Sequence, residues 1–335
     1  MSVNINNMPP QIQQNYTNKL LSTPERNCIH NLFASVIEVQ DNDGFINRQS
    51  RYDALETFEV PLDNAQMNGP AQLLTRVDVD CRVRNYMTYV VLTKQVTMTN
   101  QDPILNAAAA RLGQAYKETS DILQRDNLES SASVVNCVGG SNGDLPTEMA
   151  VSDLDDIVAL FQDNDGEYIT NMVNASDKIG TSPLGDAYTM MCTSRMIPVL
   201  NNITGFRRKF EYGTGSINTL SSEWGGVNNV RAFISSQGSV TPDASLLGND
   251  VANCFITAYE GYKVVFQAGG RAKYIYTPPG ILNDPGHLRH AAACTFYQGQ
   301  CVKSLIVNDL QPLAHLKSLL IDLETYVCED LKEAA

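Results

Sequence analysis

One long amphipathic segment limits the folds that this chain can adopt. Asp102 and Pro103 supply a helix cap and a proline at the first helical position. Apolar or small residues then recur at steps of three and four, a spacing that predicts a helix over about 103–129, roughly 40 Å long at 1.5 Å per residue. The recurring residues are Leu105, Ala108, Leu112, Ala115, Thr119 and Ile122, and the opposite face carries Arg111, Lys117, Asp121 and Arg125.

Two alternating strand patterns precede this helix. Residues 58–62 and 76–82 each alternate apolar and polar side chains, and turn-forming residues occupy 63–70 between them. The pattern predicts a long hairpin over about 52–85 with an Asn-Gly-Pro tip. Its many charges indicate that it buries little within its own subunit, so it is either a solvated flap or lies on a neighbour. The candidate contacts with a neighbouring subunit are Glu59, Asp63, Asn68, Arg76, Asp78, Arg82 and Arg84.

The other segments predict a mixed α/β body behind a polar arm. Residues 1–27 have neither helical nor strand periodicity, so we expect an arm that gains order by lying on something else. Strands are expected over 86–98, 188–192, 207–217, 230–235 and 252–267, the last with a break at Gly261. Helices are expected from Ser152, over 167–175 and near 196–203.

The C-terminal segment predicts another amphipathic helix, from about Pro312 to Lys332. Two interpretations of this helix are open. It packs on its own subunit, or it docks on an adjacent subunit or on a second protein of the same assembly. Its apolar stripe would consist of Leu313, Leu316, Leu319, Leu320, Leu323 and Val327.

The charge balance argues against several classes of protein. The 24 Lys and Arg against 37 Asp and Glu give a net charge of −13, which disfavours a surface that coats nucleic acid or an anionic membrane. No uncharged apolar run approaches the ~18–20 residues of a membrane span. No basic and apolar leader begins the sequence, so secretion is not expected. Eight widely spaced cysteines without a C-x-x-C pair predict reduced, mostly buried thiols.

A search for catalytic and metal-binding motifs gives no candidate. His287, His290, Cys294 and Cys301 have a spacing that departs from zinc sites, which pair their cysteines two to four residues apart. The glycines near residues 139–143 and 213–215 complete neither a phosphate-binding loop nor a dinucleotide fingerprint. The sequence therefore predicts a protein that is not an enzyme, with no catalytic residue, no bound metal and no cofactor.

Six short strings between about residues 50 and 310 share their order with one known protein family. They are Pro61-Leu62-Asp63, Gln101-Asp102-Pro103, Gly185-Asp186-Ala187-Tyr188, Ile197-Pro198-Val199-Leu200, Ser222–Arg231 and Asn283-Asp284-Pro285-Gly286. Together with the polar arm, charged hairpin and long helix, they resemble the major capsid proteins of tailed bacteriophages, the Hong Kong 97-type shell subunits. Within that family the strings are similar to the branch typified by phage N4.

The resemblance implies an α+β fold with named parts. These are an N-terminal arm (1–45), an extended loop with flanking strands (46–100), a peripheral domain with a long spine helix (101–180), an axial domain (181–272), peripheral return strands (273–311) and the C-terminal helix (312–335).

The resemblance also implies a function. The chain would be a structural protein that self-assembles, as hexamers and pentamers, into an icosahedral shell in the host cytoplasm. The shell would be the virion capsid and enclose double-stranded DNA without sequence-specific binding or a membrane. Cement, portal and scaffold proteins are further candidate partners. Two alternatives stay open: the shell protein of a bacterial nanocompartment with the same fold, and a soluble α/β enzyme with unfamiliar motifs.

Overall fold

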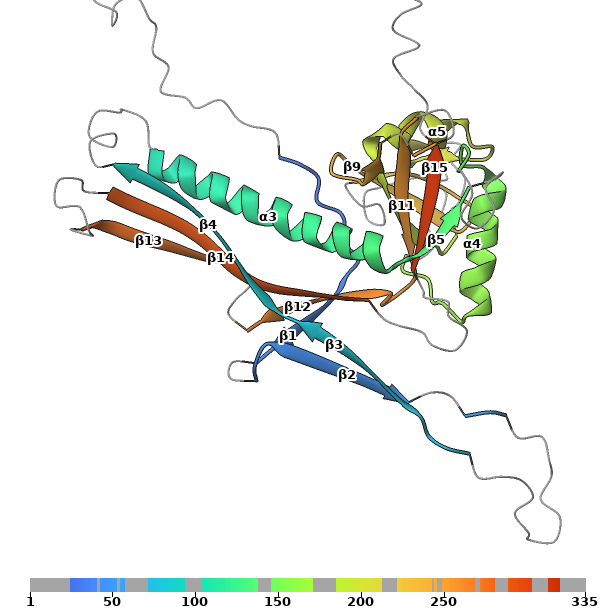
Figure 1. Ribbon diagram of the computed structural model, residues 1–335. Helices are drawn as coiled ribbons and strands as arrows, with labels where there is room; N and C mark the ends of the chain where they lie inside the picture. The colour runs from blue at the N-terminus through green and yellow to red at the C-terminus, as the bar shows by residue number, and fades with distance from the viewer. Residues whose placement is uncertain are drawn as a thin grey trace, which may run out of the picture. The chain divides into compact units, whose positions relative to one another are not determined.

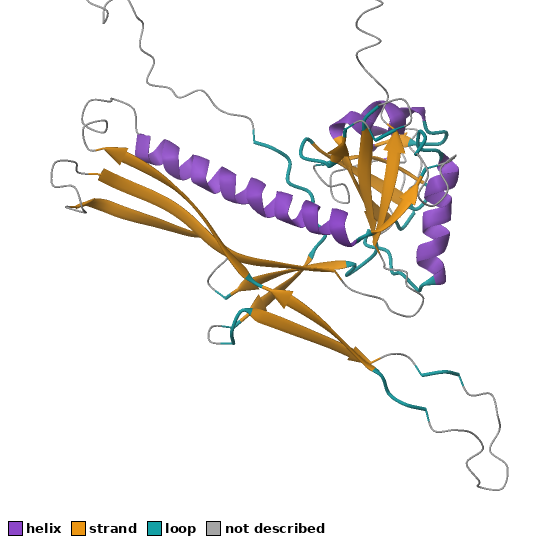
Figure 2. Cartoon of the chain, viewed as in Figure 1, coloured by secondary structure: helices purple, strands orange, loops and turns teal. Residues whose placement is uncertain are grey.

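The computed structural model contains both helices and strands, which confirms the α+β class (Figures 1 and 2). It describes residues 25–40, 43–52, 55–57, 72–93, 104–137, 146–170, 185–212, 222–242, 244–245, 249–268, 272–280, 289–302 and 313–319. The described helices are α3 (Ile104–Ser131), α4 (Val151–Asp163), α5 (Ile197–Asn202), α6 (Lys209–Tyr212) and the 3-10 turn η2 (Ser194–Met196). None of the helices in these ranges combines the length and hydropathy of a membrane span.

The described strands are fifteen segments that form three sheets. The first eight are β1 (Ser35–Val39), β2 (Ile46–Tyr52), β3 (Arg76–Arg82), β4 (Arg84–Thr93), β5 (Ser133–Asn136), β6 (Tyr188–Thr193), β7 (Arg207–Arg208) and β8 (Glu223–Val227). The others are β9 (Val230–Ser235), β10 (Val240–Thr241), β11 (Val251–Thr257), β12 (Tyr262–Gln267), β13 (Lys273–Gly280), β14 (Arg289–Val302) and β15 (Leu313–Leu319).

The chain divides into two compact units. The first comprises residues 1–25, 87–116 and 273–295, and the second comprises 26–86, 117–272 and 296–335. In the first unit β13 runs antiparallel to β14, and β4 also pairs with β14. Leu112 on α3 packs there against Ala292 and Cys294 of β14. This part of the helix thus lies along one face of the sheet (Figure 1).

The helix predicted over 103–129 is confirmed as α3, which spans residues 104–131. Its buried positions recur every four residues, as a helix that lies along a surface requires. In the second unit these positions are polar as well as apolar: Ser120, Asp121 and Gln124 are buried together with Leu128. Asp121 therefore does not belong to the charged solvent face where the periodicity placed it.

An eight-stranded sheet forms the core of the second unit. Its strands run in the order β5-β15-β11-β6-β9-β8-β7, and β10 pairs with β11. Every residue of β6 and β11 is buried, because α4 and α5 cover one face of the sheet and the C-terminal part of α3 covers the other. Leu154 of α4 packs against the first face, and Leu128 of α3 packs against the second. A strand covered on both faces needs apolar side chains in both directions.

The segment 313–319 corrects the prediction of a C-terminal helix, because it forms strand β15. It pairs antiparallel with β11 over seven residues and parallel with β5 over four, so both of its edges carry ladder hydrogen bonds. Ser318 is fully buried, and its hydroxyl accepts a hydrogen bond from the Met149 backbone N–H at 3.1 Å. These long-range pairings override the helical spacing of the leucines. The rest of the predicted helix, 320–332, lies outside the described residues.

Three other local expectations also need correction. The hairpin that leads to residue 85 is formed by β2 and β3, with Tyr52 opposite Arg76 and Ile46 opposite Arg82. Its first strand is therefore 46–52, and the predicted strand 58–62 lies outside the described residues. Residues 167–170 are not helical, since Thr170 forms a β-bridge with Ala187. The expected strand from Arg207 ends after two residues, where α6 begins.

Candidate assembly surface

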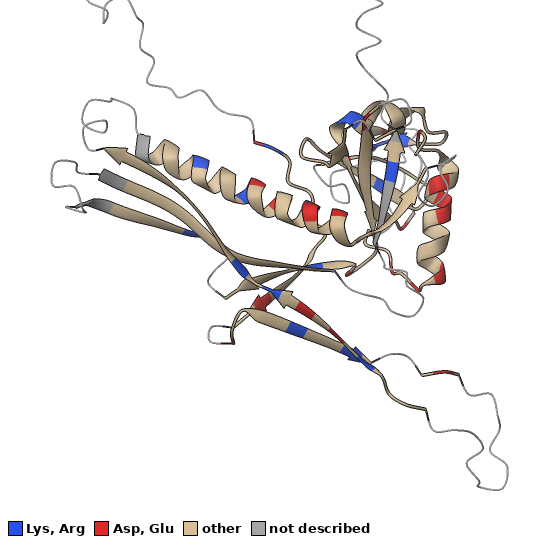
Figure 3. Cartoon of the chain, viewed as in Figure 1, with Lys and Arg blue, Asp and Glu red and all other residues tan. Residues whose placement is uncertain are grey.

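The β2–β3 ribbon separates its side chains into a charged face and a more buried face. In β3, Arg76, Asp78, Asp80 and Arg82 are exposed, whereas the residues between them are half-buried or buried. Figure 3 marks positively charged residues in blue and negatively charged residues in red along this ribbon. The separation follows from the two-residue period of a strand. The other face carries Val77, Val79 and Cys81 from β3 with Asn47, Gln49 and Arg51 from β2.

Ion pairs within the ribbon neutralise several of these charges. Nε and Nη2 of Arg48 donate to the two carboxylate oxygens of Asp80 at 2.6 and 2.8 Å, a bidentate pair across the strands. Arg76 donates to Asp78 at 2.7 Å and to the Ser50 hydroxyl at 2.7 Å. The hydrogen bond from Arg48 lowers the pKa of Asp80. Hydrogen bonds from Ser50 and Arg76 lower the pKa of Asp78.

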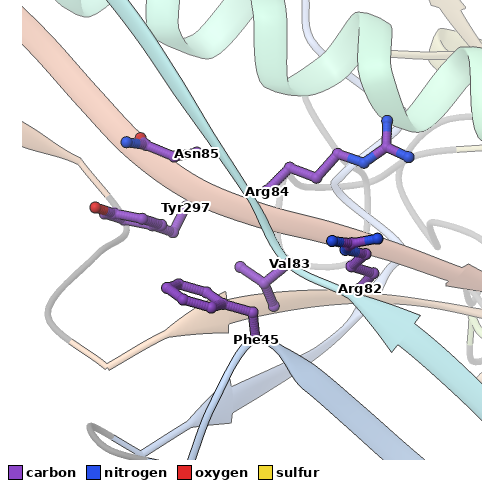
Figure 4. A pocket seen from close by; sticks show the side chains of 6 residues that line it. All are labelled: Phe45, Arg82, Val83, Arg84, Asn85 and Tyr297. Atoms are coloured by element: carbon purple, nitrogen blue, oxygen red, sulfur yellow. The ribbon is translucent and has the colours of Figure 1, made fainter.

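The base of the ribbon is the end at which Ile46 of β2 lies opposite Arg82 of β3. A hollow of about 630 Å³ lies beside it (Figure 4). The rings of Phe45 and Tyr297 stack there with centroids 6.3 Å apart. Arg82 and Arg84 line the hollow, are exposed and form no ion pair within the described part of the chain. Figure 4 shows their guanidinium groups extending away from the two rings. The surface therefore offers apolar ring faces next to unneutralised cations, which suits carboxylate groups of another molecule. Val83 and Asn85 complete the lining.

The segment that leads into β1 is fixed to the second unit by buried polar contacts. The Tyr262 hydroxyl donates to the His30 backbone carbonyl at 2.6 Å. The Asn31 amide donates to the Ser120 hydroxyl at 2.9 Å, and Ser120 donates to Gln298 at 2.6 Å. Residues from about 27 onward are therefore tied to the folded body by polar contacts. The polar residues 1–24 lie outside the described residues.

The described residues contain no group of three metal-ligating side chains. Cys294 and Cys301, two of the four residues weighed for a zinc site, belong to different hydrophobic clusters. His287 lies outside the described residues. The charged face of the ribbon and the arginines beside the hollow can instead make polar contacts with another molecule.

Comparison with known proteins identifies the fold. No protein-family model and no curated protein matches the sequence. The capsid of Ralstonia phage GP4 superposes with a TM-score of 0.64 at 11% identity, covering 96% of this chain and 99% of that chain. The Cyanophage Pam1 capsid gives 0.63 at 14% identity, covering 94% and 98%. The head of Helicobacter pylori bacteriophage KHP40 gives 0.60 at 10% identity, covering 95% and 97%.

The chain has the Hong Kong 97-type capsid fold. The expectation from the ordered sequence strings is confirmed at this level. Because the match extends over nearly the full length of both chains, the capsid fold includes the ribbon and the long helix as well as the sheet of the second unit.

Within the capsid fold, four of the seven predicted contact residues are described. Arg76 and Asp78 lie on the charged face of the ribbon, and Arg82 and Arg84 lie at its base beside the hollow. Glu59, Asp63 and Asn68 lie outside the described residues. Sequence reasoning missed Arg48, Phe45 and Tyr297, because it placed the first ribbon strand too late in the chain. The sequence Asp41-Asn42-Asp43-Gly44 is a turn signal, but the strand after it was not predicted: Gly44 has a φ of +85°, and β2 begins two residues later.

Proposed function

We propose that this chain is the major capsid protein of a tailed bacteriophage. The observation that supports the proposal most strongly is the capsid fold, which matches 96% of this chain and 99% of the Ralstonia phage GP4 capsid chain. The subunits would assemble as hexamers and pentamers into an icosahedral shell, the virion capsid, and assembly would take place in the host cytoplasm. A purely structural role, without catalysis, follows from this proposal.

The parts of the fold receive proposed roles on the same basis. Residues 1–45 are the N-terminal arm, 46–100 the extended loop with its flanking strands, and 101–180 the peripheral domain with α3 as spine helix. Residues 181–272 are the axial domain, and 273–311 return to the peripheral domain. The last part, 312–335, begins with strand β15 in the sheet of the second unit.

The ribbon is the part that we expect to contact neighbouring copies. Its internal ion pairs neutralise Arg48, Asp80, Arg76 and Asp78, whereas Arg82 and Arg84 keep their charges available. The whole chain carries a net charge of −13, so a cationic patch at the base of the ribbon suits the acidic surface of another copy. The described ribbon also has a polar face that no core of its own covers.

Two finer assignments remain parts of the proposal. The sequence strings support the branch typified by phage N4, and cement, portal or scaffold proteins are candidate partners of the shell. A nanocompartment shell of the same fold is the alternative, because the fold by itself does not distinguish what a shell encloses. The phage proposal requires packaged double-stranded DNA, and the nanocompartment requires an enzyme cargo.

Electron microscopy of the purified protein tests the proposal directly. We expect closed, icosahedral particles after expression of the full chain, alone or with a scaffold from its own genome. Particles isolated from a natural lysate should contain double-stranded DNA protected from nuclease. A monodisperse monomer at all concentrations and with every candidate scaffold would contradict the assembly function. Particles filled with enzyme and without DNA would favour the nanocompartment.

A further inference from the structure

Two cysteine thiols meet where β3 crosses β14. Cys81 of β3 is 1% exposed and Cys301 of β14 is 7% exposed, and both belong to one hydrophobic cluster with Val39, Val83 and Val265. The two thiols lie close enough for each to influence the ionisation of the other. The Cys81 thiol also lies 3.4 Å from the Gln300 carbonyl oxygen, directly beside Cys301 in the chain.

The backbone of β14 lets Cys81 come this close. A Cβ atom built on Gly299 would lie 2.9 Å from the Cys81 sulfur and 2.8 Å from the Arg82 carbonyl oxygen. Only a glycine leaves room for β3 to approach β14 at this point. The contact joins residues that are far apart in sequence, and both lie in the second unit of the chain.

The surroundings of the two sulfurs favour a thiolate on Cys301. Cys301 is opposite Lys263 in the β12–β14 ladder. The hydrogen bond from Cys81 lowers the pKa of Cys301, and the positive charge of Lys263 lowers it further, whereas burial opposes both effects. The same hydrogen bond, together with burial, raises the pKa of Cys81. The position of Lys263 opposite Cys301 favours Cys301 as the nucleophile, which leaves Cys81 as the resolving thiol.

We propose that Cys81 and Cys301 form a disulfide when the protein meets a peroxide, and that this bond fastens the base of the ribbon to β14. The Cys301 thiolate attacks hydrogen peroxide, an S–O bond forms, and the O–O bond breaks. The departing hydroxide takes up a proton to become water, which leaves a sulfenic acid on Cys301. The Cys81 thiol then attacks this sulfur, the S–O bond breaks, and the second water departs. Two thiols are oxidised, and one peroxide is reduced to two waters.

Formation of the bond joins two residues that already share one hydrophobic cluster. The two sulfurs must close to about 2.05 Å to form a disulfide. Cross-linking residues so distant in sequence restricts the unfolded chain strongly, so the oxidised protein should be the more stable form. The buried position limits the oxidant to a small molecule, a condition that hydrogen peroxide meets.

A second thiol pair in the fold provides an internal comparison. Cys192 and Cys254 lie on the neighbouring strands β6 and β11, next to the paired residues Met191 and Phe255. Cys192 and Cys254 are 1% and 0% exposed, whereas Cys301 in the first pair is 7% exposed. We therefore expect hydrogen peroxide to leave this pair as thiols under conditions that oxidise Cys81 and Cys301.

Peptide mapping of the full chain tests the proposal. The reduced protein is treated with hydrogen peroxide, its remaining thiols are alkylated in denaturant, and it is digested with trypsin without reductant. We expect mass spectrometry to find the 77–82 peptide, which carries Cys81, joined to the 290–303 peptide, which carries Cys294 and Cys301. Dithiothreitol should separate them. The oxidised protein should also unfold several °C higher than the reduced protein, by roughly the shift expected of a disulfide.

Three variants assign the bond to its residues. Cys301→Ser and Cys81→Ser should each lose the joined peptides and the rise in unfolding temperature. Cys294→Ser, which alters the same tryptic peptide, should keep both. The peptide map of the wild-type protein detects the disulfide without any variant. The proposal therefore stays testable even if one of the three variants does not fold.

Several outcomes would overturn the proposal. They are sulfinic or sulfonic acid on Cys301 with no joined peptide, a cross-link to Cys294 or between two chains, and oxidation of Cys192 and Cys254 first. The measured bond lies within one chain, so the inference does not depend on the proposed capsid function. If the peptide map shows no disulfide, the proposal of shell assembly still stands. If the protein fails to assemble, the peptide map still tests the disulfide.

Discussion

Nδ1 of His30 lies 2.8 Å from Oδ2 of Asp121, and both side chains are fully buried. The other carboxylate oxygen, Oδ1, accepts the backbone N–H of His30 at 2.7 Å and that of Asn31 at 3.3 Å. One carboxylate in the middle of α3 therefore accepts two backbone N–H groups of the segment that leads into β1 and also contacts the His30 ring. A buried charge is tolerated in a protein interior only with such a set of partners.

Replacing this carboxylate should destabilise the fold strongly. We expect Asp121→Ala to lower the free energy of unfolding by about 3–5 kcal/mol, because it leaves buried donors without an acceptor. Asp121→Asn should cost less, since its amide oxygen still accepts the His30 N–H. Urea unfolding followed by circular dichroism measures the effect. Asp126→Asn is the matched control: Asp126 is exposed on the same helix and pairs with Arg125, so a change under about 1 kcal/mol is expected. Equal losses in the two variants would contradict this interpretation.

Two glycine substitutions should have opposite effects on stability. A Cβ on Gly238 would lie 2.6 Å from the Thr193 backbone nitrogen, and backbone cannot move aside as a flexible side chain can. Gly238→Ala should therefore destabilise the protein by roughly 1–3 kcal/mol. Gly113 lies inside α3 with nothing within 4 Å of a new Cβ, so Gly113→Ala should stabilise by about 0.5–1 kcal/mol. The unfolding temperatures of both variants are compared with that of the wild type. A higher unfolding temperature for Gly238→Ala would contradict the predicted backbone clash.

Charge reversal at the base of the ribbon should affect assembly rather than folding. Arg82→Glu combined with Arg84→Glu changes exposed residues, so the unfolding free energy should stay within about 0.5 kcal/mol of wild type. We expect the yield of particles in electron microscopy to fall at least tenfold, because the cationic patch is lost. The control is Arg48→Gln with Asp80→Asn, which removes a pair already neutralised within the ribbon and should assemble normally. Normal particles from the charge-reversed protein would exclude this patch as an assembly contact.

Deleting residues 60–72 tests the extended-loop assignment more severely. The deleted segment contains the predicted tip, and the core strands of both units lie outside it. We expect a folded, soluble subunit with an unchanged circular dichroism spectrum that fails to close shells. Size-exclusion chromatography and electron microscopy provide the two readouts. Particles of normal size and number from the shortened chain would show that the assignment is wrong.

The cysteines should differ in the pH at which they react. A pKa below the usual 9.0, caused by Cys81 and Lys263, makes Cys301 a thiolate at lower pH than an ordinary thiol. Burial and the carboxylates of Asp121 and Glu118 raise the pKa of Cys28 to about 11. Iodoacetamide labelling should therefore reach half its maximal rate at lower pH for Cys301 than for Cys28. Site-resolved mass spectrometry measures both, and the reverse order would contradict the assigned environments.

The sequence alone determined the elements whose signal is local. Asp102-Pro103 and the three- and four-residue spacing predict α3 within two residues of its observed ends. Period-two alternation predicts β3, and the order of short strings along the chain indicates the capsid fold. The periodic signals depend on neighbours a few residues apart, and such neighbours keep their relations in any tertiary arrangement.

Tertiary structure decided the features that depend on partners far along the chain. Leu313–Leu319 has helical spacing, yet it becomes β15 because β5 and β11 offer ladder partners to both of its edges. Asp121 has the spacing of a surface charge on the helix, yet it is buried because the backbone N–H groups of His30 and Asn31 donate hydrogen bonds to its carboxylate. Cys81 and Cys301 are 220 residues apart, and only the crossing of β3 over β14 brings their sulfurs together. Sequence periodicity reports which face a residue shares with its neighbours, but the free energy of burial depends on what the folded chain places against that face.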